Sequence, residues 1–563
     1  MTAQLTLGDE GLSISFASSD EATLSLAAPF LIAVLRAVRT DSTFLISEGE
    51  LAQSLKAILV FFAKRALPIE LDAHAQQLVG DIETSRREFD QARDSAQAGE
   101  PPALDTDTLQ RELTALQREA AAHLVQVQNG ANFSVPGAGK TTVAYAAFAA
   151  LRKNSIVDKL VVVAPRAAFL PWEEEFQACF GHPAASVRLT GGRVARDRIY
   201  ARSDDYELFL TTYQTATNDT NRLKGLCRRH RVMLILDESH YVKRLEDGQW
   251  ARAVLDLAPY AARRVILSGT PMPQGYEDLW TQFTFLWPGR EVLGEKHAYR
   301  RRVERGDTAD IRGSVRPFFR RITKRDLNLP ELHIERIVVP LAPEQQRIYD
   351  AIREKVLNEL RLQPSDRQLL RQWKRARLVR LLQASSNPAL LSEYSEEFSL
   401  ARDEASDRSV IDVAQHYGDV EVPAKFVRAR ELVLDLVARG RKVVVWTSFV
   451  KNIIMFRQLI GDRVPTFIVY GAVPRDPSED EEFNREQQIS QFKETVGPAV
   501  LIANPAACGE SISLHHACKD AIYLDRTFDC AKYVQSQDRI HRLGLAPGDV
   551  CDGIPTPRVR HHR

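Results

Sequence analysis

The stretch Ser134-Val-Pro-Gly-Ala-Gly-Lys-Thr-Thr142 brings two glycines, a lysine and two threonines together directly after an apolar run. Glycine lets backbone N–H groups approach phosphate oxygens closely, and the N-terminus of a following helix adds positive potential. Lys140 would then reach the β and γ phosphates of a nucleotide, and the Thr141 hydroxyl would ligate Mg²⁺. The residues predicted to contact the nucleotide are Pro136, Gly137, Ala138, Gly139, Lys140, Thr141 and Thr142.

The usual spacing of such a loop, G-x-x-x-x-G-K-S/T, has glycine where this chain has Ser134. That departure makes the motif less specific when it is taken alone. The alternative is a glycine-rich turn that binds no nucleotide. The predicted strand before the loop and the helical pattern after it favour the phosphate-binding interpretation.

A second group with chemical potential is Asp237-Glu238-Ser239-His240, which ends the apolar run VMLILD. A carboxylate at the carboxyl end of a parallel strand faces the crevice in which α/β sheets bind ligands. Asp237 can therefore hold Mg²⁺, and Glu238 can orient and deprotonate an attacking water. Paired acids at a strand end are sometimes only helix caps or solvated charge. The presence of Lys140 upstream, in the same predicted α/β lobe, argues against that interpretation.

These side chains need a sheet to position them, and short β-branched runs indicate one. The runs alternate with longer amphipathic stretches in two separate blocks. Strands separated by helices imply crossover connections and a parallel sheet that is buried on both faces. The sequence therefore predicts an α/β protein with two tandem parallel-sheet lobes. The predicted strands are 131–135, 160–164, 208–212, 232–237 and 264–268 in the first lobe, and 442–446, 466–470, 499–503 and 521–525 in the second.

The chain of 563 residues is long enough for three to four domains of about 150 residues each. Residues 1–105 begin with an alternating run and end in a polar, proline-containing linker, so we expect a small N-terminal accessory domain of unknown role. Residues 110–290 and 425–545 are the predicted lobes. Residues 291–424 are predicted to form a helical, basic insertion, and residues 546–563 a short basic tail.

Composition is that of an ordinary globular protein, with 44% hydrophobic and 26% charged residues. A net charge of +1 does not identify any kind of binding partner, so a nucleic-acid-binding surface would depend on local clustering of basic residues. The cysteines form no C-x-x-C pair, which argues against a disulfide framework or a zinc site. Neither a signal peptide nor a membrane-spanning run is evident, and we therefore expect a cytoplasmic, nucleoid-associated prokaryotic protein rather than a nuclear one.

The order of the motifs resembles the Swi/Snf-type ATPases of helicase superfamily 2. VRPFFRRITKRDLNLP, from residue 315, is similar to a signature of that branch that an ordinary unwinding helicase lacks. The other matching stretches are 134–142, 161–176, 237–243 and 268–280 in the first lobe, 380–391 in the middle, and 442–449, 503–514 and 535–544 in the second lobe.

This resemblance implies two RecA-like lobes that hydrolyse ATP between them, and it assigns roles to further residues. Gln117 would read the adenine edge, while Arg539 and Arg542 would act as arginine fingers toward the γ-phosphate. Residues that would couple the nucleotide state to a bound strand are His240, Ser268, Gly269, Thr270, Gly509 and Gln535. Residues that would contact nucleic-acid phosphates are Arg166, Thr211, Thr212, Thr447, Ser448 and Asn504.

The family branch implies an ATP-dependent translocase on double-stranded DNA, with Mg²⁺ as cofactor and backbone contacts that are independent of sequence and sensitive to salt. Basic clusters at 296–325 and 371–380 would add duplex contacts; the alternative for both is a solvated helical face. Protein partners would bind through the N-terminal domain.

Two other functions stay open. One is a DNA or RNA helicase that separates strands, and the other is an ATP-dependent nucleic-acid clamp or scaffold with little turnover. The clamp hypothesis depends on the C-terminus, because few residues follow Gly544 and Leu545 stands where the family has glutamine. We expect the last strand and helix of the second lobe to be missing, which would hold the arginine fingers poorly.

Overall fold

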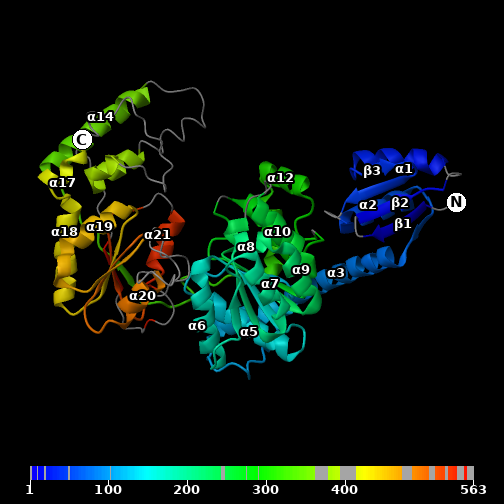
Figure 1. Cartoon of the computed structure of the whole chain (residues 1–563), viewed down its shortest axis with the longest axis horizontal. Coiled ribbons are helices and arrows are strands. Elements are labelled where there is room, and N and C mark those ends of the chain that lie inside the picture. Colours follow the sequence, from blue (N-terminus) through cyan, green and yellow to red (C-terminus); the bar gives the residue numbers. More distant parts are fainter. Residues whose placement is uncertain are drawn as a thin grey trace. The chain divides into compact units, whose positions relative to one another are not determined.

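The computed structural model of the chain describes residues 3–8, 11–17, 21–47, 51–99, 101, 103–242, 248–273, 275–289, 291–361, 378–392, 414–471, 485–505, 514–526, 530–541, 545 and 551–554. Contacts divide the chain into two compact units. The first consists of Met1–Ser134, Lys140–Ala164 and Glu173–Arg321, and the second of Val135–Gly139, Pro165–Trp172 and Ile322–Arg563. Figure 1 shows the elements of both units coloured along the chain.

The first unit begins with a five-stranded sheet of order β3-β4-β2-β1-β5. The alternating run at the start of the chain forms an antiparallel hairpin that buries Leu5, Leu12 and Ile14 on one face. The long helix α3, Ala73–Gln97, follows the sheet. The ring of Phe89 on α3 lies 5.2 Å from Trp287, so this helix packs on the larger part of the unit. The strands are β1 Ala3–Gly8, β2 Gly11–Ser15, β3 Val38–Thr40, β4 Thr43–Ser47 and β5 Ile69–Leu71, and the helices before α3 are α1 Glu21–Ala33 and α2 Leu51–Lys64.

A seven-stranded sheet forms the middle of the first unit, with the order β12-β6-β11-β10-β7-β9-β8. Its paired strands run parallel throughout the described residues, which confirms the predicted α/β class. The strands are β6 Gly130–Asn132, β7 Lys159–Val163, β8 Ser186–Arg188, β9 Leu208–Thr211, β10 Val232–Asp237, β11 Arg263–Leu267 and β12 Phe319–Arg320. The five strands predicted for this lobe are present; β8 and β12 were not predicted, and both lie at the edges of the sheet.

Helices connect these parallel strands, as crossover connections require. Helix α4 Ala115–Gln126 precedes β6, and the connecting helices are α5 Lys140–Lys153, α6 Phe169–Phe180, α7 Arg193–Ala201, α8 Tyr213–Asn218, α9 Thr220–Arg229, α10 Gln249–Leu257, α11 Leu279–Leu286, α12 Lys296–Arg305 and α13 Thr308–Val315. Helix α5 starts at Lys140, directly after the glycine-rich loop, as the sequence pattern predicts.

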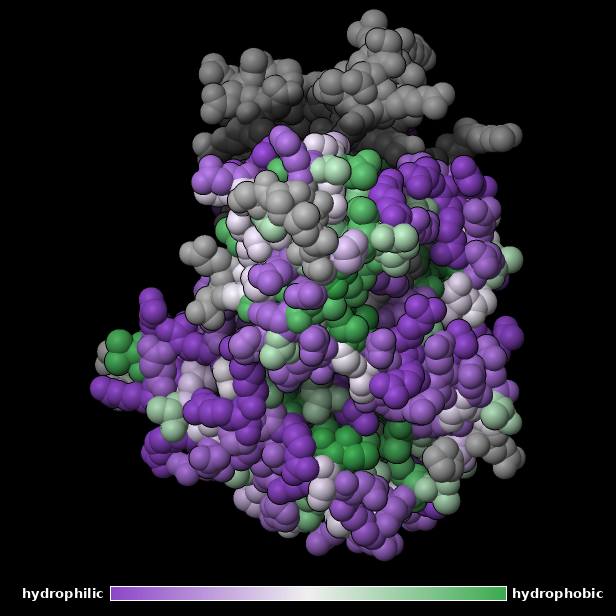
Figure 2. Space-filling model, turned by 90° about the vertical axis from the view of Figure 1, so that its right-hand side faces the viewer, coloured by the Kyte–Doolittle hydropathy of each residue, from purple (hydrophilic) through white to green (hydrophobic). Residues whose placement is uncertain are grey.

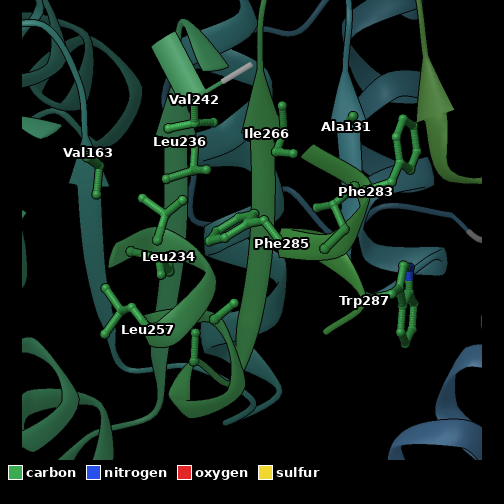
Figure 3. Close-up of a cluster of buried hydrophobic side chains, with 14 of the residues drawn as sticks. Ala131, Val163, Leu234, Leu236, Val242, Leu257, Ile266, Phe283, Phe285 and Trp287 are labelled. Atoms are coloured by element: carbon green, nitrogen blue, oxygen red, sulfur yellow. The ribbon is translucent and has the colours of Figure 1, made fainter. Parts of the chain in front are cut away.

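The core of this unit packs α11 against the central strands. Figure 3 shows Leu234 of β10 and Ile266 of β11 beside Phe285 of α11, and these three side chains are fully buried. Burial of each large apolar side chain contributes about 1.5–3 kcal/mol. Helix α11 is therefore held firmly against the two strands that end at Asp237 and Leu267.

The second unit contains a six-stranded sheet of order β13-β18-β17-β14-β16-β15, whose paired strands also run parallel in the described residues. The strands are β13 Leu332–Ile334, β14 Val443–Trp446, β15 Thr466–Val469, β16 Val500–Ala503, β17 Asp520–Tyr523 and β18 Cys551–Ile554. The four predicted strands are present. The expectation that the last strand is missing was wrong, because β18 pairs with β17 and with β13.

The helices of the second unit are α14 Pro343–Arg361, α17 Tyr417–Val420, α18 Ala424–Ala438, α19 Val450–Ile460, α20 Arg485–Glu494 and α21 Cys530–Gln537. The segment 291–424, predicted to be helical, contains the strands β12 and β13 as well as helices. Its first part belongs to the first unit, since Tyr299 and Ile311 join the core there. The prediction that residues 291–424 form a separate domain stays a prediction.

Hydrophilic residues cover most of the face of the molecule shown in Figure 2. In the described part of the chain, no helix combines the length and the apolar character that crossing a membrane would require.

Candidate nucleotide site and second-lobe network

The parallel register brings three motifs to one edge of the first-unit sheet. Asn132 of β6 is level with Leu267 of β11, and Leu267 is level with Asp237 of β10. Adjacent strands lie about 4.8 Å apart, so the ends of β6 and β10 are separated by only two strand spacings. Three motifs therefore leave the sheet at the same edge: the glycine-rich loop after β6, the D-E-S-H box (residues 237–240) at the end of β10, and the S-G-T-P loop (residues 268–271) after β11.

The structure explains why serine can replace the first glycine of the loop. The backbone N–H of Ser134 donates to Asn132 Oδ1 at 3.1 Å, and the Ser134 hydroxyl donates to the same oxygen. Ser134 is not among the residues with positive φ, so this position does not need glycine. Lys140 Nζ donates to the Ser134 carbonyl at 3.3 Å, which places the ammonium group over the loop that would hold the phosphates.

Two glycines in the loop have conformations that other residues rarely adopt. Gly137 has φ +84° and Gly139 has φ +78°, in the left-handed region that favours glycine. Ala138 N–H closes the turn by donating to the Val135 carbonyl at 3.2 Å. This backbone has the form expected of a phosphate-binding turn, and the roles of Pro136 to Gly139 toward a nucleotide stay predictions.

The two threonines at the start of α5 differ in their surroundings. Thr142 is buried, and its hydroxyl donates to Glu175 Oε1 at 2.5 Å, so that side chain braces α5 against α6. Thr141 is half-buried in the first turn of the helix. The Thr142 hydroxyl is thus engaged by Glu175, and ligation of Mg²⁺ by Thr141 stays a prediction. Glu175 lies within the matching stretch 161–176, but the sequence assigned it no role as a supporting residue.

The D-E-S-H box makes a sharp, well-anchored turn. Asp237 and Glu238 are both buried, and Glu238 has φ +51°, an unfavourable conformation for a residue with a Cβ. The turn is held by Tyr213, whose hydroxyl donates to the Asp237 carbonyl at 2.7 Å, and by Glu238 N–H, which donates to Asp237 Oδ1 at 2.9 Å. His240 Nδ1 lies 3.4 Å from Glu238 Oε2. These bonds hold the backbone turn that carries the two acids.

The S-G-T-P loop starts beside the end of β6. Ser268 is buried, and its N–H donates to the Asn132 carbonyl at 3.2 Å. The Ser268 hydroxyl accepts from Thr270 N–H at 3.2 Å, while Gly269 and Thr270 are half-buried. The predicted coupling residues His240, Ser268, Gly269 and Thr270 therefore lie in the same unit, at the ends of adjacent strands.

Gln117 has a structural partner in addition to its predicted role. The backbone N–H of Thr114 donates to Gln117 Oε1 at 3.0 Å, and Gln117 N–H donates to Thr114 Oγ1 at 3.2 Å. This reciprocal pair is a capping box at the start of α4. Recognition of adenine by Gln117 stays a prediction.

The first-lobe residues proposed for nucleic acid lie at loop starts after β7 and β9. Arg166 begins a short 3-10 turn and is half-buried. Thr212 caps α8, since its hydroxyl accepts from Thr215 N–H at 3.1 Å, and Thr211 is fully buried. Contact with phosphates by these three residues stays a prediction.

Asp525, which sequence reasoning missed, organises the matching edge of the second-unit sheet. Its Oδ1 accepts from Ser448 N–H at 2.6 Å, and its Oδ2 accepts from the Thr447 hydroxyl at 2.5 Å. Asn504 Nδ2 donates to the Ser448 carbonyl at 2.9 Å. Thr447, Ser448 and Asn504 are all buried. The structure thus brings together the three predicted residues, and their contact with nucleic acid stays a prediction. The sequence signal that could have identified Asp525 is an acid at the end of an apolar run, as at Asp237.

The same network extends to the middle of the chain. Asn452 Nδ2 on α19 donates to Ser386 Oγ at 3.0 Å, and Ser386 donates to Asp525 Oδ2 at 3.2 Å. Lys425 on α18 is buried nearby; burial lowers the pKa of its ammonium group to about 8, while the charge of Asp525 opposes that shift. The matching stretch 380–391, which contains Asn387, is therefore tied to the second lobe, because Asn387 Nδ2 donates to Asn452 Oδ1 at 3.0 Å.

The last predicted motif follows α21. Gln535 and Arg539 are buried, and the Arg539 carbonyl accepts from Leu514 N–H at 2.9 Å. His541 Nε2 lies 2.7 Å from the Pro330 carbonyl, which ties this motif to the Swi/Snf-like signature. Arg542 and Gly509 lie outside the described residues. The roles of Arg539, Arg542, Gly509 and Gln535 stay predictions.

Comparisons with known proteins agree with this arrangement. Residues 109–387 match the family model described as the SNF2-related domain. The Bacillus subtilis (strain 168) protein YwqA, whose name proposes an ATP-dependent helicase/translocase, is 25% identical over 401 residues, which cover 68% of this chain and 39% of YwqA. The uncharacterized ATP-dependent helicase MG018 of Mycoplasma genitalium is 24% identical over 415 residues, covering 72% of this chain and 36% of that protein.

Among solved structures, the Sulfolobus solfataricus SWI2/SNF2 ATPase core in complex with dsDNA is 23% identical with a TM-score of 0.39, and the match covers 81% of this chain and 90% of that one. The chain spans less than half the length of the two relatives named above. The family match covers the three motifs that the first-unit sheet brings to one edge. Residues 109–387 therefore form an SNF2-related domain, the domain of the Swi/Snf-type ATPases of helicase superfamily 2.

Proposed function

We propose that the chain is a DNA-dependent ATPase that moves along double-stranded DNA and remodels or displaces what is bound there. The observation that carries the proposal is the row Asn132, Leu267 and Asp237 across the first-unit sheet, which gathers the glycine-rich loop, the acids and the S-G-T-P loop at one edge. Ligands of open α/β sheets bind at this edge, outside the carboxyl ends of the strands.

Hydrolysis of ATP asks the protein mainly to position groups and to neutralise charge. Lys140 would bind the β and γ phosphates, and Glu238 would orient the attacking water and take its proton. Thr141 and Asp237 would hold Mg²⁺, because a hydroxyl and a carboxylate oxygen are ligands this ion accepts when nucleotide phosphates supply the others. Mg²⁺ supplies charge neutralisation on the phosphates.

Arg539 and Arg542 of the second lobe would add positive charge at the γ-phosphate when the lobes close. Arginine fingers raise hydrolysis rates by about 10³ to 10⁵, so turnover would depend on closure. ATP must then bind the closed state more tightly than the open state, because a ligand with equal affinity for both shifts nothing. That difference in affinity is what would drive movement along a strand.

Duplex DNA is the partner that the family branch supports, and the relatives' names include ATP-dependent helicase and helicase/translocase. Arg166, Thr211 and Thr212 of the first lobe would contact the phosphate backbone. The strand β18 is present in the second-unit sheet, which removes one of the grounds for proposing a clamp with little turnover, the expected loss of that strand.

The test is the ATPase rate measured in parallel without polymer and with single-stranded DNA, duplex DNA and RNA. We expect duplex DNA to stimulate turnover most. The apparent affinity should fall steeply with salt, by about 0.9 log units per log unit of salt for each phosphate neutralised. A rate indifferent to every nucleic acid would defeat the proposal, and preferential stimulation by RNA or single strands would favour a strand-separating helicase.

A further inference from the structure

Gln282 on α11 has a fully buried side chain that bridges two of the motifs at the sheet edge. Its Oε1 accepts from the Ser239 hydroxyl at 2.7 Å, so one end of the amide touches the D-E-S-H box. Its Nε2 donates to the Pro271 carbonyl at 2.8 Å, so the other end touches the S-G-T-P loop. A third bond, from Nε2 to the Asp278 carbonyl at 2.8 Å, fixes the amide on its own helix.

Packing alone does not call for an amide at this position. Figure 3 shows its neighbour Phe283 and the nearby Phe285 of the same helix among apolar side chains. A buried polar group is costly unless it is hydrogen-bonded, whereas an apolar side chain of similar size would fill the space without that requirement. Both N–H groups of the amide and its carbonyl are used here, so the side chain has one orientation only.

The loop that Gln282 touches is anchored on one side and tied to the box on the other. Ser268, at its start, is fixed to β6 through the Asn132 carbonyl. Pro271, three residues later, is held through Gln282 to Ser239, which directly follows Glu238. Ser239 and Pro271 are therefore held by one fully bonded amide that is itself fixed on α11, so the box and the loop keep their position relative to each other.

We propose that Gln282 is a positioning residue for hydrolysis, which holds the D-E-S-H box through Ser239 and the S-G-T-P loop through Pro271 in a fixed relative position. The inference rests on the proposed function in that its readout is ATP turnover. It assigns a direct part in the cycle to α11, of which only the first two residues lie in the matching stretch 268–280. The sequence alone does not distinguish Gln282, which is buried, from a glutamine that faces solvent.

The experiment is a double-mutant cycle of Ser239→Ala and Gln282→Leu, with kcat and KM for ATP measured with and without duplex DNA. We expect each single variant to lower kcat about tenfold while KM changes less than about twofold, since the bridge positions the acids and does not bind ATP. The double variant should be no slower than the slower single variant, because both changes break one unit.

Ser203→Ala is the matched control. Ser203 is also buried, and its hydroxyl bonds His230 Nε2 at 3.1 Å, away from the three motifs. It should lose a comparable amount of thermal stability and keep the wild-type kcat. The melting temperature of each variant shows whether it folds. If Gln282→Leu does not fold, the kcat of Ser239→Ala alone tests the inference.

Unchanged kcat in the folded variants, or effects that multiply to about a hundredfold in the double variant, would overturn the inference. Wild-type protein in the same assay distinguishes failure of this inference from failure of the proposed function. If duplex DNA fails to stimulate wild-type turnover, the proposed function is wrong, and the cycle is then read on basal turnover.

Discussion

Replacing Glu238 with glutamine is expected to lower kcat for ATP hydrolysis by about a thousandfold and to leave ATP binding intact. The amide keeps the size of the carboxylate but cannot take a proton from water. Since Glu238 is buried in a turn fixed by Tyr213 and Asp237, the substitution has little room to rearrange. Binding of a fluorescent ATP analogue and release of phosphate measure the two quantities separately.

Glu174→Gln is the control for this change, because Glu174 is an exposed carboxylate on α6 of the same lobe. It should hydrolyse ATP at the wild-type rate. Normal turnover in Glu238→Gln would remove Glu238 from its proposed role as the general base, whereas loss of ATP binding would show that its charge serves the nucleotide pocket instead.

Replacing Lys140 with alanine is expected to weaken ATP binding by about 10- to 100-fold, the range that one charge-assisted hydrogen bond of roughly 1.5–3 kcal/mol provides. The effect should be smaller for ADP, because the lost contact includes the γ-phosphate. In the structure Lys140 Nζ is bonded to the Ser134 carbonyl, an oxygen it can exchange for a phosphate oxygen at little cost. Calorimetric titration with ATP and with ADP measures the difference.

Lys64→Ala, at an exposed position at the end of α2, is the matched loss of one positive charge and should bind both nucleotides as the wild type does. Equal affinity of Lys140→Ala and wild-type protein for ATP would mean that the glycine-rich turn binds no nucleotide, which is the alternative that the sequence left open.

Much of the sheet architecture could be predicted because it depends on buried apolar runs. VMLILD and VVVW are buried along their whole length, and such runs have no stable place except inside a sheet covered on both faces. The strands that escaped prediction are short and mixed in composition, such as Phe319–Arg320 and Cys551–Ile554. They become strands because a neighbouring strand offers unpaired backbone groups, and this information lies elsewhere in the chain.

The candidate site likewise contains residues that could be predicted from the sequence and residues that could not. The chemistry of Lys140, Asp237 and Glu238 could be read from residue type and spacing, because phosphate binding needs those groups in that order. The residues that hold them, Gln282 and Glu175, could not be found in this way. Their importance comes from partners that are distant in the sequence, Ser239 and Thr142.

The most direct test of the central claim is displacement of a third DNA strand from a linear triplex, with the chain loaded on the duplex part. Movement along duplex DNA should release the third strand when ATP is present and should leave a forked duplex paired, and Glu238→Gln should release nothing. ATP hydrolysis with the triplex left intact, or separation of the forked strands, would contradict the proposed translocation along double-stranded DNA.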